Sequence, residues 1–274
     1  MKNILVIMKR MVSLLFLFMT CSLITCNLFS QEPAYTNDIG MKFVLIKPGK
    51  MIVGKFQPTV GKKDFKGNPL PEQLNRTSEE MAGKDAMPGF TVMIDNGYYI
   101  GSYEITQGQW QKVMGNNPSV FQNDSTAKHP VDNVTWNDTQ AFIKKLNALD
   151  KKHKYRLPTE FEWEYAARAG ALDDISWKEI QVSAVLGGTM TAIIGTKKPN
   201  AWGLYDMLGN VWEWVQDFYN EKIFADRVSP KSGKEHVLKG SSFTGDVKNA
   251  TYMTHAAGPG NGFDIGFRLV MEAN

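Results

Sequence analysis

The chain has 274 residues, of which 43% are hydrophobic and 22% are charged, and its formal net charge is +3. This size suits one large domain or two small ones, and the composition is ordinary for a globular protein. The net charge is too small to indicate nucleic acid or a charged membrane surface as a partner. With 24 glycines and 12 prolines, the sequence predicts a loop-rich fold with many tight turns.

The first 30 residues have the layout of a secretory signal peptide. Lys9 and Arg10 precede the apolar run "MVSLLFLFMTCSLITCNLFS", which ends in a small residue. We expect cleavage after Ser30 and export to the periplasm or the extracellular space. Two alternatives stay open. "LITC" is a loose lipobox, so that Cys26 could be acylated and attach a lipoprotein to the membrane, and the run is nearly long enough to remain as a membrane anchor.

Both cysteines of the chain, Cys21 and Cys26, lie in this signal. The mature domain therefore has no thiol for a disulfide, a thiolate metal site or a cysteine nucleophile. An exported domain without disulfides must rely on its core or on bound ions for stability.

The N-terminal half of the mature chain is predicted to begin with strands. We read residues 31–38 as a short linker, then strands at 43–46 and 51–53 joined by the Pro48-Gly49 turn as a hairpin. Residues 55–90 are polar with little periodicity and are interpreted as a surface insertion. "FTVMIDNGYYIGSYEIT" then returns to the alternation of a strand.

Three helices and two final strand segments follow. Thr106 with Gln109, and Thr159 with Glu162, have capping-box spacing at the start of "TQGQWQKVMG" and "PTEFEWEYAARAG". "NDTQAFIKKLNAL" has one apolar helical face, with Asn137 as the expected cap. "HVLKGSSF" and "IGFRLVME" read as strands. Together these elements predict an α+β domain with much irregular structure.

Several fragments, in chain order, carry a resemblance to a known family. They are "FVLIKPGKMIVG", "YYIGSYEITQGQW", "HPVDNVTWNDTQAFIKKLN", "YRLPTEFEWEYAARAG", "NAWGLYDMLGNVWEW", "VLKGSSF" and "IGFRLV". In this order they resemble the formylglycine-generating enzyme family, also called the sulfatase-modifying-factor family. The resemblance covers residues 39–271 and implies a single domain of a fold related to C-type lectins.

The family's founding activity is the copper-dependent oxidation of a sulfatase cysteine to formylglycine. Thiolates are the ligands that select copper(I). Aligning "GSSF" with the family's strand places Gly245 and Ala250 at the two active-site cysteines, and Thr251 and His255 at arginines common in relatives. The resemblance therefore implies that copper is not bound and that the oxidase reaction is absent.

The resemblance also implies one calcium site in this chain. In the family's formylglycine-generating members, the positions of Asp206, Gly209, Val211 and Glu213 supply side-chain and carbonyl ligands. Calcium takes six to eight oxygen ligands and tolerates irregular geometry. We expect a structural calcium ion here; without one, Asp206 would cap a turn. The family's second site, between positions 170 and 199, is not expected.

Iron-dependent relatives bind their metal through histidines of an added helical domain, which this sequence lacks. Its dispersed histidines are His129, His153, His236 and His255, none of which forms a helical His-x-x-x-His pair. A catalytic metal site normally needs three converging ligands, so we read His129 and His153 as surface residues.

These observations favour a binding or scaffold module of the cell envelope, in which the former catalytic face binds a peptide, a glycan or a partner protein. The candidate ligand-binding residues are Phe243, Gly245, Asp246, Ala250, Tyr252 and His255. The alternative is a noncanonical oxidoreductase or a tailoring or maturation enzyme, with His255 and Asp246 as a general-base pair. A third possibility, a lipoprotein within a larger envelope assembly, depends on acylation of Cys26.

Overall fold

The largest sheet joins segments from both ends of the described chain. The computed structural model describes residues 34–54, 89–122, 125–172, 175–247 and 250–273, so the predicted signal and nearly all of the predicted insertion lie outside them. Residues 33–274 form one compact unit. As predicted, the fold is α+β. No helix among the described residues has the length and apolar character needed to cross a bilayer.

The five-stranded sheet has the order β1-β2-β5-β11-β6, and each of its pairs is antiparallel. Its strands are β1 (Ala34–Thr36), β2 (Lys42–Ile46), β5 (Tyr98–Gly101), β11 (Val270–Glu272) and β6 (Tyr155–Arg156). Strand β1 comes from residues that the sequence placed in a linker, and its Tyr35 lies opposite Phe43 of β2.

The second sheet has the order β10-β7-β8-β9, in which β10 runs parallel to β7 and the other pairs are antiparallel. Its strands are β10 (Ile265–Gly266), β7 (Trp212–Phe218), β8 (His236–Lys239) and β9 (His255–Ala257). A third sheet pairs β3 (Gly49–Val53) with β4 (Phe90–Ile94). The predicted hairpin between β2 and β3 is therefore wrong: each strand pairs with a segment beyond the insertion, because sheet partners are chosen by long-range packing.

The three predicted helices are α3 (Gln107–Met114), α4 (Trp136–Leu149) and α5 (Glu160–Arg168). The capping boxes of Thr106 and Thr159 are confirmed. The cap of α4 is Thr135 and not Asn137, because Thr135 and Asp138 each accept a hydrogen bond from the other's backbone N–H. The sequence did not predict α6 (Trp177–Ser183), α7 (Ile223–Asp226) or the 3-10 helix Thr126–Lys128.

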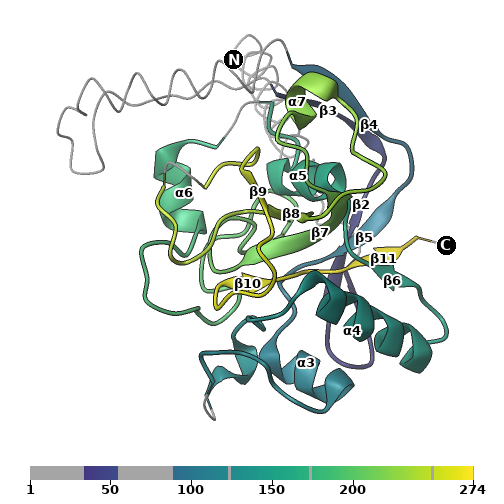
Figure 1. Ribbon diagram of the computed structural model, residues 1–274, viewed down its shortest axis with the longest axis vertical. Coiled ribbons are helices and arrows are strands. Elements are labelled where there is room, and N and C mark those ends of the chain that lie inside the picture. The colour runs from purple at the N-terminus through teal and green to yellow at the C-terminus, as the bar shows by residue number, and fades with distance from the viewer. Residues whose placement is uncertain (1–33, 55–88, 123–124, 173–174, 248–249, 274) are drawn as a thin grey trace, which may run out of the picture. The chain divides into compact units, whose positions relative to one another are not determined.

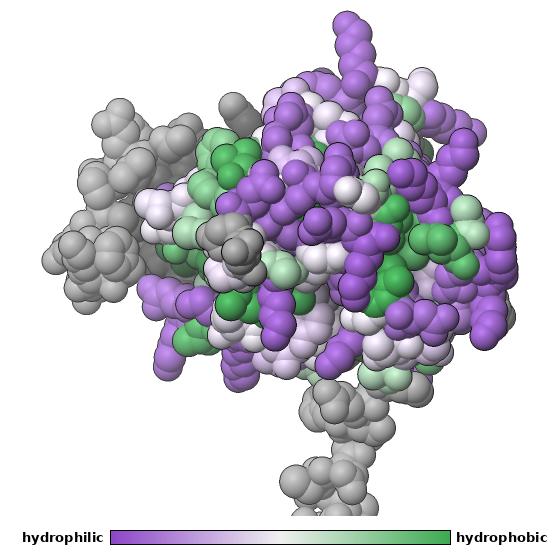
Figure 2. Space-filling model, turned by 90° about the horizontal axis from the view of Figure 1, so that it is seen from below, coloured by the Kyte–Doolittle hydropathy of each residue, from purple (hydrophilic) through white to green (hydrophobic). Residues whose placement is uncertain are grey.

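Two hydrophobic clusters form the core. One gathers around Trp163 of α5 and Val215 of β7, and the other gathers around Trp110, Phe142 and Phe267. Helices α3 and α4 lie side by side at one end of the molecule in Figure 1, and Trp110 of α3 stacks on Phe142 of α4 with 5.2 Å between ring centroids. On the face shown in Figure 2, hydrophobic areas are separated by hydrophilic side chains.

Candidate functional site

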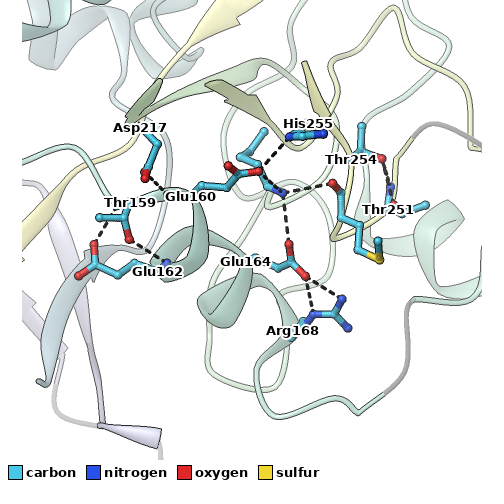
Figure 3. Close-up of polar contacts among 11 residues, drawn as sticks. Thr159, Glu160, Glu162, Glu164, Arg168, Asp217, Thr251, Thr254 and His255 are labelled. Carbon is cyan, nitrogen blue, oxygen red and sulfur yellow. Dashed lines mark hydrogen bonds and ion pairs between the residues drawn. The ribbon is translucent and has the colours of Figure 1, made fainter. Parts of the chain in front are cut away.

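Helix α5 presents a row of charged side chains to the second sheet (Figure 3). The row forms because Glu160, Glu164 and Arg168 follow one another at intervals of four residues, which places them on one helical face. All three are buried. The capping box of Thr159 starts the helix, and the N–H of Glu160 donates to Oδ2 of Asp217 on β7 over 2.6 Å.

Lys239 of β8 faces this row and is completely buried. Its Nζ lies 3.3 Å from Oε2 of Glu164 and 3.8 Å from Oε1 of Glu160. Arg168 occupies the other oxygen of Glu164, with Nη2 2.7 Å from Oε1. Nζ of Lys239 also donates to the carbonyl oxygen of Met253 over 3.3 Å. The lysine therefore ties the connection between β8 and β9 to α5.

His255, the first residue of β9, is the outermost member of this cluster. Its Nδ1 lies 3.0 Å from Oε1 of Glu160, an ion-pair contact whose angles fall outside hydrogen-bond geometry. Burial raises the pKa of Glu160, but His255 and Lys239 outweigh that effect and lower it. The rings of Tyr219 and Phe224 each lie 5.3 Å from the imidazole. The carboxylate beside His255 is thus Glu160, where the sequence suggested Asp246.

The structure divides the six predicted ligand-binding residues between two environments. Ala250 and Tyr252 are buried in the first core cluster, and Arg168 lies over the Tyr252 ring at 5.5 Å. Phe243 is buried elsewhere, among other phenylalanines. Gly245 closes a turn by donating its N–H to the carbonyl oxygen of Ser242, and Asp246 follows it. The predicted residues therefore do not gather around a single open groove.

The surroundings of Phe243 form what we call the aromatic ledge, defined by Phe121, Phe243 and Phe263. Ring centroids lie 5.6 Å apart for Phe121 and Phe243, 6.0 Å for Phe243 and Phe263, and 6.3 Å for Phe121 and Phe263. Phe243 is the buried base, whereas Phe263 is 48% exposed. The ledge therefore presents an apolar edge to solvent.

Polar groups adjoin the aromatic ledge. Oδ2 of Asp264 accepts hydrogen bonds from Ser242 over 2.6 Å and Thr244 over 3.0 Å. Asp132 is nearby and fully buried, its Oδ1 accepts from the N–H of Val120, and burial raises its pKa to about 6. Sequence reasoning missed Asp132, Phe263 and Asp264. The Phe263-Asp264 pair, directly before the final strands, was the available signal.

The four predicted calcium ligands are all buried. Asp206 is buried with a left-handed backbone, and its Oδ2 accepts from the N–H of Gly195 over 2.6 Å. Its Oδ1 and Oε2 of Glu104 are both buried without a hydrogen-bond partner. Asn210 holds the other oxygen of Glu104 over 3.1 Å. Two unsatisfied carboxylate oxygens in a buried site fit the preference of calcium for oxygen ligands. Glu104 was not predicted.

Unlike Glu104 and Asp206, Glu213 has hydrogen-bond partners at both of its carboxylate oxygens. Its Oε2 accepts from Nε of Arg268 and from Nε1 of Trp163, both over 2.7 Å, and its Oε1 accepts from Nη2 of Arg268 over 2.6 Å. Oε1 thus retains a lone pair for a cation, whereas Oε2 has none. Gly209 and Val211 are buried beside it and could contribute only carbonyl oxygens.

The surroundings of Glu104 and Asp206 disfavour the ionised form of both carboxyl groups. Burial, followed by the charge of Asp206, raises the pKa of Glu104 well above its usual value. Burial raises the pKa of Asp206 to about 6, although Gly195 and Arg268 act in the opposite direction. No group of three or more His, Cys, Asp or Glu side chains within the described ranges is arranged to hold a metal, so a cation here needs backbone oxygens as well.

The other histidines have partners of their own, and Nδ1 of His236 lies 3.2 Å from the carbonyl oxygen of Asp217. His129 is buried, against the expectation of a surface position, with Nδ1 3.1 Å from Oγ1 of Thr191. His153 pairs with Asp150 at 2.8 Å, and His236 stacks on Trp136 with 3.8 Å between centroids. His129 is buried because its turn lies beneath the segment that carries Thr191.

Comparisons with known proteins agree with the resemblance read from the sequence. The sequence model of the sulfatase-modifying factor enzyme 1-like domain matches residues 30–273. The chain is 28% identical over 231 residues to the chaperone protein LppX of Paenibacillus barcinonensis, covering 63% of this chain and 79% of that protein. It is 32% identical over 163 residues to the formylglycine-generating enzyme of Streptomyces coelicolor, covering 49% of this chain and 50% of the enzyme. The chain therefore spans about half the length of that enzyme.

Solved structures show the same fold. PvdO from Pseudomonas aeruginosa superposes with a TM-score of 0.71 at 21% identity, covering 89% of this chain and 99% of that one. Treponema denticola variable protein 1 gives a TM-score of 0.69 at 26% identity, covering 88% and 99%. Matches that span almost the whole of each neighbour identify one domain of this fold.

Proposed function

Because the chain belongs to the family of the sulfatase-modifying factor enzyme 1-like domain, we propose that it is an exported binding or scaffold module of the cell envelope. It binds a peptide, a glycan or a partner protein and does not carry out the copper-dependent oxidation of the family's founding members. The observation that carries this proposal is the aromatic ledge, which exposes Phe263 beside Asp264, in a chain that has no cysteine after Cys26.

The missing thiols support the loss of the oxidase site. The alignment of "GSSF" with the family's strand matches Gly245 and Ala250 to the two cysteine positions, and the chain has no cysteine after Cys26. Copper(I) selects soft thiolate ligands, which glycine and alanine cannot replace. Ala250 is also fully buried, so its position no longer opens to a substrate.

The aromatic ledge supports a binding role. Phe263 exposes about half of its side chain beside Asp264, which combines an apolar edge with a carboxylate and two hydroxyl groups. Exposed aromatic side chains beside a few fixed polar groups are typical of binding surfaces. LppX, which is called a chaperone, is a relative consistent with a protein partner.

A structural calcium ion is part of this proposal. Asp206 and Glu104 would hold it through their unpartnered oxygens, with backbone carbonyl groups such as those of Gly209 and Val211 as further ligands. The ion would neutralise buried carboxylates and thereby stabilise a domain that has no disulfide.

The oxidase question has a direct test. Protein supplied with copper(I), oxygen and a cysteine peptide taken from a sulfatase should leave the peptide mass unchanged. The formylglycine-generating enzyme of Streptomyces coelicolor serves as the positive control. Aldehyde formation by this chain would contradict the proposal.

The binding surface can be tested in cells with a photo-crosslinking amino acid. Placed at Phe263, it should give a discrete adduct with one partner. Placed at Leu172, which is 87% exposed and distant in the chain from the ledge, it should not. Equal adducts from both positions, or none from Phe263, would count against the ledge. Mass spectrometry of the mature N-terminus separates cleavage after Ser30 from acylation of Cys26.

A further inference from the structure

Residues 250–257 end in a buried charge cluster, and that cluster contains one imidazole, that of His255. Residues 250–257 are held at one end by core packing of Ala250 and Tyr252 and at the other by pairing of β9 with β8. Between these lies the contact of His255 with Glu160, with Nδ1 3.0 Å from Oε1. Imidazole is the side chain whose charge ordinarily changes between pH 5 and 8.

We infer that the contact between His255 and Glu160 is a pH-sensitive latch that holds residues 250–257 against α5. The latch is closed when the imidazole is protonated and is weakened when the imidazole is neutral. Nothing in the proposed binding function is needed for this device.

A count of charges around His255 supports the direction of the effect. Each element packed against it contributes named groups. They are Glu160, Glu164 and Arg168 from α5, Asp217 from β7, Lys239 from β8, Tyr219 after β7, and the Phe224 ring from α7. Asp226 of α7 is bonded to Asn220. The cluster thus has three carboxylates and two permanent cations, and a protonated His255 supplies the third cation.

Because the cluster is buried, an unequal number of positive and negative charges in it costs free energy. Glu160, Glu164 and Lys239 are at most 2% exposed, so water cannot compensate an unpaired charge among them. His255, with a side chain that is 13% exposed, is the member through which a proton can be exchanged with solvent. Loss of that proton leaves Nζ of Lys239, 3.8 Å away, as the charged group that faces Oε1 of Glu160.

The rest of the segment depends on the same contact. Lys239 donates to the carbonyl oxygen of Met253, and Oγ1 of Thr254 accepts from the N–H of Thr251 over 3.1 Å. These bonds fasten the turn that leads into β9, which is the edge strand of its sheet. An edge strand has backbone partners on one side alone, so its pairing is sensitive to the loss of one side-chain anchor.

The test is amide hydrogen exchange of residues 250–257 in the full mature chain, measured at pH 5.5 and pH 8 and corrected for the intrinsic pH dependence of exchange. A charged imidazole attracts the Glu160 carboxylate 3.0 Å away and a neutral one does not, so wild-type protection should fall about tenfold as the pH rises. His255→Gln should lose that protection at both pH values. The matched control His236→Gln, on neighbouring β8, should keep the wild-type pH dependence.

Corrected protection that is equal at both pH values in the wild-type protein would overturn the inference, and so would an unchanged pH dependence in His255→Gln. Because the wild-type measurement is decisive by itself, a variant that fails to fold does not remove the test. A fall in protection across the whole domain, rather than in residues 250–257, would also contradict a local latch.

Discussion

Arg268 and Glu213 form a doubly hydrogen-bonded ion pair in the interior, with Nε 2.7 Å from Oε2 and Nη2 2.6 Å from Oε1. The same guanidinium donates to the carbonyl oxygens of Gly101, Tyr205 and Asp206. One side chain thereby connects the end of β5, the start of β7 and the turn that bears the proposed calcium ligand.

Arg268→Met should destabilise the protein severely. It leaves the buried Glu213 carboxylate and several carbonyl groups without partners, which costs about 3–5 kcal/mol for a broken buried pair. Urea unfolding followed by tryptophan fluorescence measures the loss. Arg156→Met is the control, because Arg156 pairs with Glu162 but is 30% exposed. We expect Arg156→Met to lower the unfolding free energy by about 1 kcal/mol. Similar losses for both variants would contradict the special role of Arg268.

Calcium should stabilise the domain, and more so at higher pH. Asp206, with a pKa raised to about 6, and Glu104, whose pKa is also raised, each stabilise the calcium-free fold below pH 4 and lose that contribution as the pH rises. A bound cation replaces those protons. We therefore expect a chelator to lower the melting temperature strongly at pH 7.5 and weakly at pH 5.

The variants Glu104→Gln and Asp206→Asn sharpen that experiment. Each removes one unpartnered carboxylate oxygen, so each should reduce the effect of the chelator while raising the stability of the calcium-free protein at pH 7.5. Exposed Asp95→Asn is the control and should behave as the wild type. If the chelator leaves the wild-type melting temperature unchanged at both pH values, the calcium proposal fails.

Asp132→Asn should flatten the dependence of stability on pH between 4 and 6. The raised pKa of Asp132, about 6, means that this group favours the folded state at low pH and loses that contribution as the pH rises through 6. The amide oxygen of asparagine can still accept from the N–H of Val120. At pH 7 we expect a gain of about 1–3 kcal/mol in unfolding free energy, measured by urea titration. A loss of stability at pH 7 would show that the carboxylate has a favourable partner.

Substitutions at two glycines measure the cost of a left-handed backbone with and without an added steric collision. Gly115 and Gly209 both have positive φ, 87° and 79°. A methyl group on Gly115 meets open space, whereas one on Gly209 collides with the backbone of Val185. Gly115→Ala should therefore cost about 1–2 kcal/mol, the price of a left-handed backbone alone. Gly209→Ala should cost more, and thermal melting of both variants gives the comparison.

Local signals in the sequence predicted much of the fold. The capping boxes at Thr106 and Thr159 were readable because both partners lie within three residues of each other. The cap of α4 was misread because Thr135 and Asn137 are both suitable caps, and the position of Asp138 decides between them. Strand pairing was misread for β2 and β3, since nothing local in either strand specifies a partner.

Less of the candidate site could be predicted from the sequence, because its contacts join residues that are far apart in the chain. Glu104 lies in an ordinary strand-like stretch, and its importance arises only when folding buries it near Asp206 and Arg268. The contact of His255 with Glu160 joins residues from β9 and α5, so the sequence could offer only the nearby Asp246. The loss of both thiols, by contrast, was visible in composition alone.

The position of β11 between β5 and β6 has a consequence for biosynthesis. Residues 98–101 and 155–156 are made early, but each pairs with β11, so their sheet stays open until residues 270–272 have left the ribosome. Partners as far apart in the chain as Ile100 and Val270 must therefore meet before the sheet is complete, and such long-range pairing is typical of slow folding.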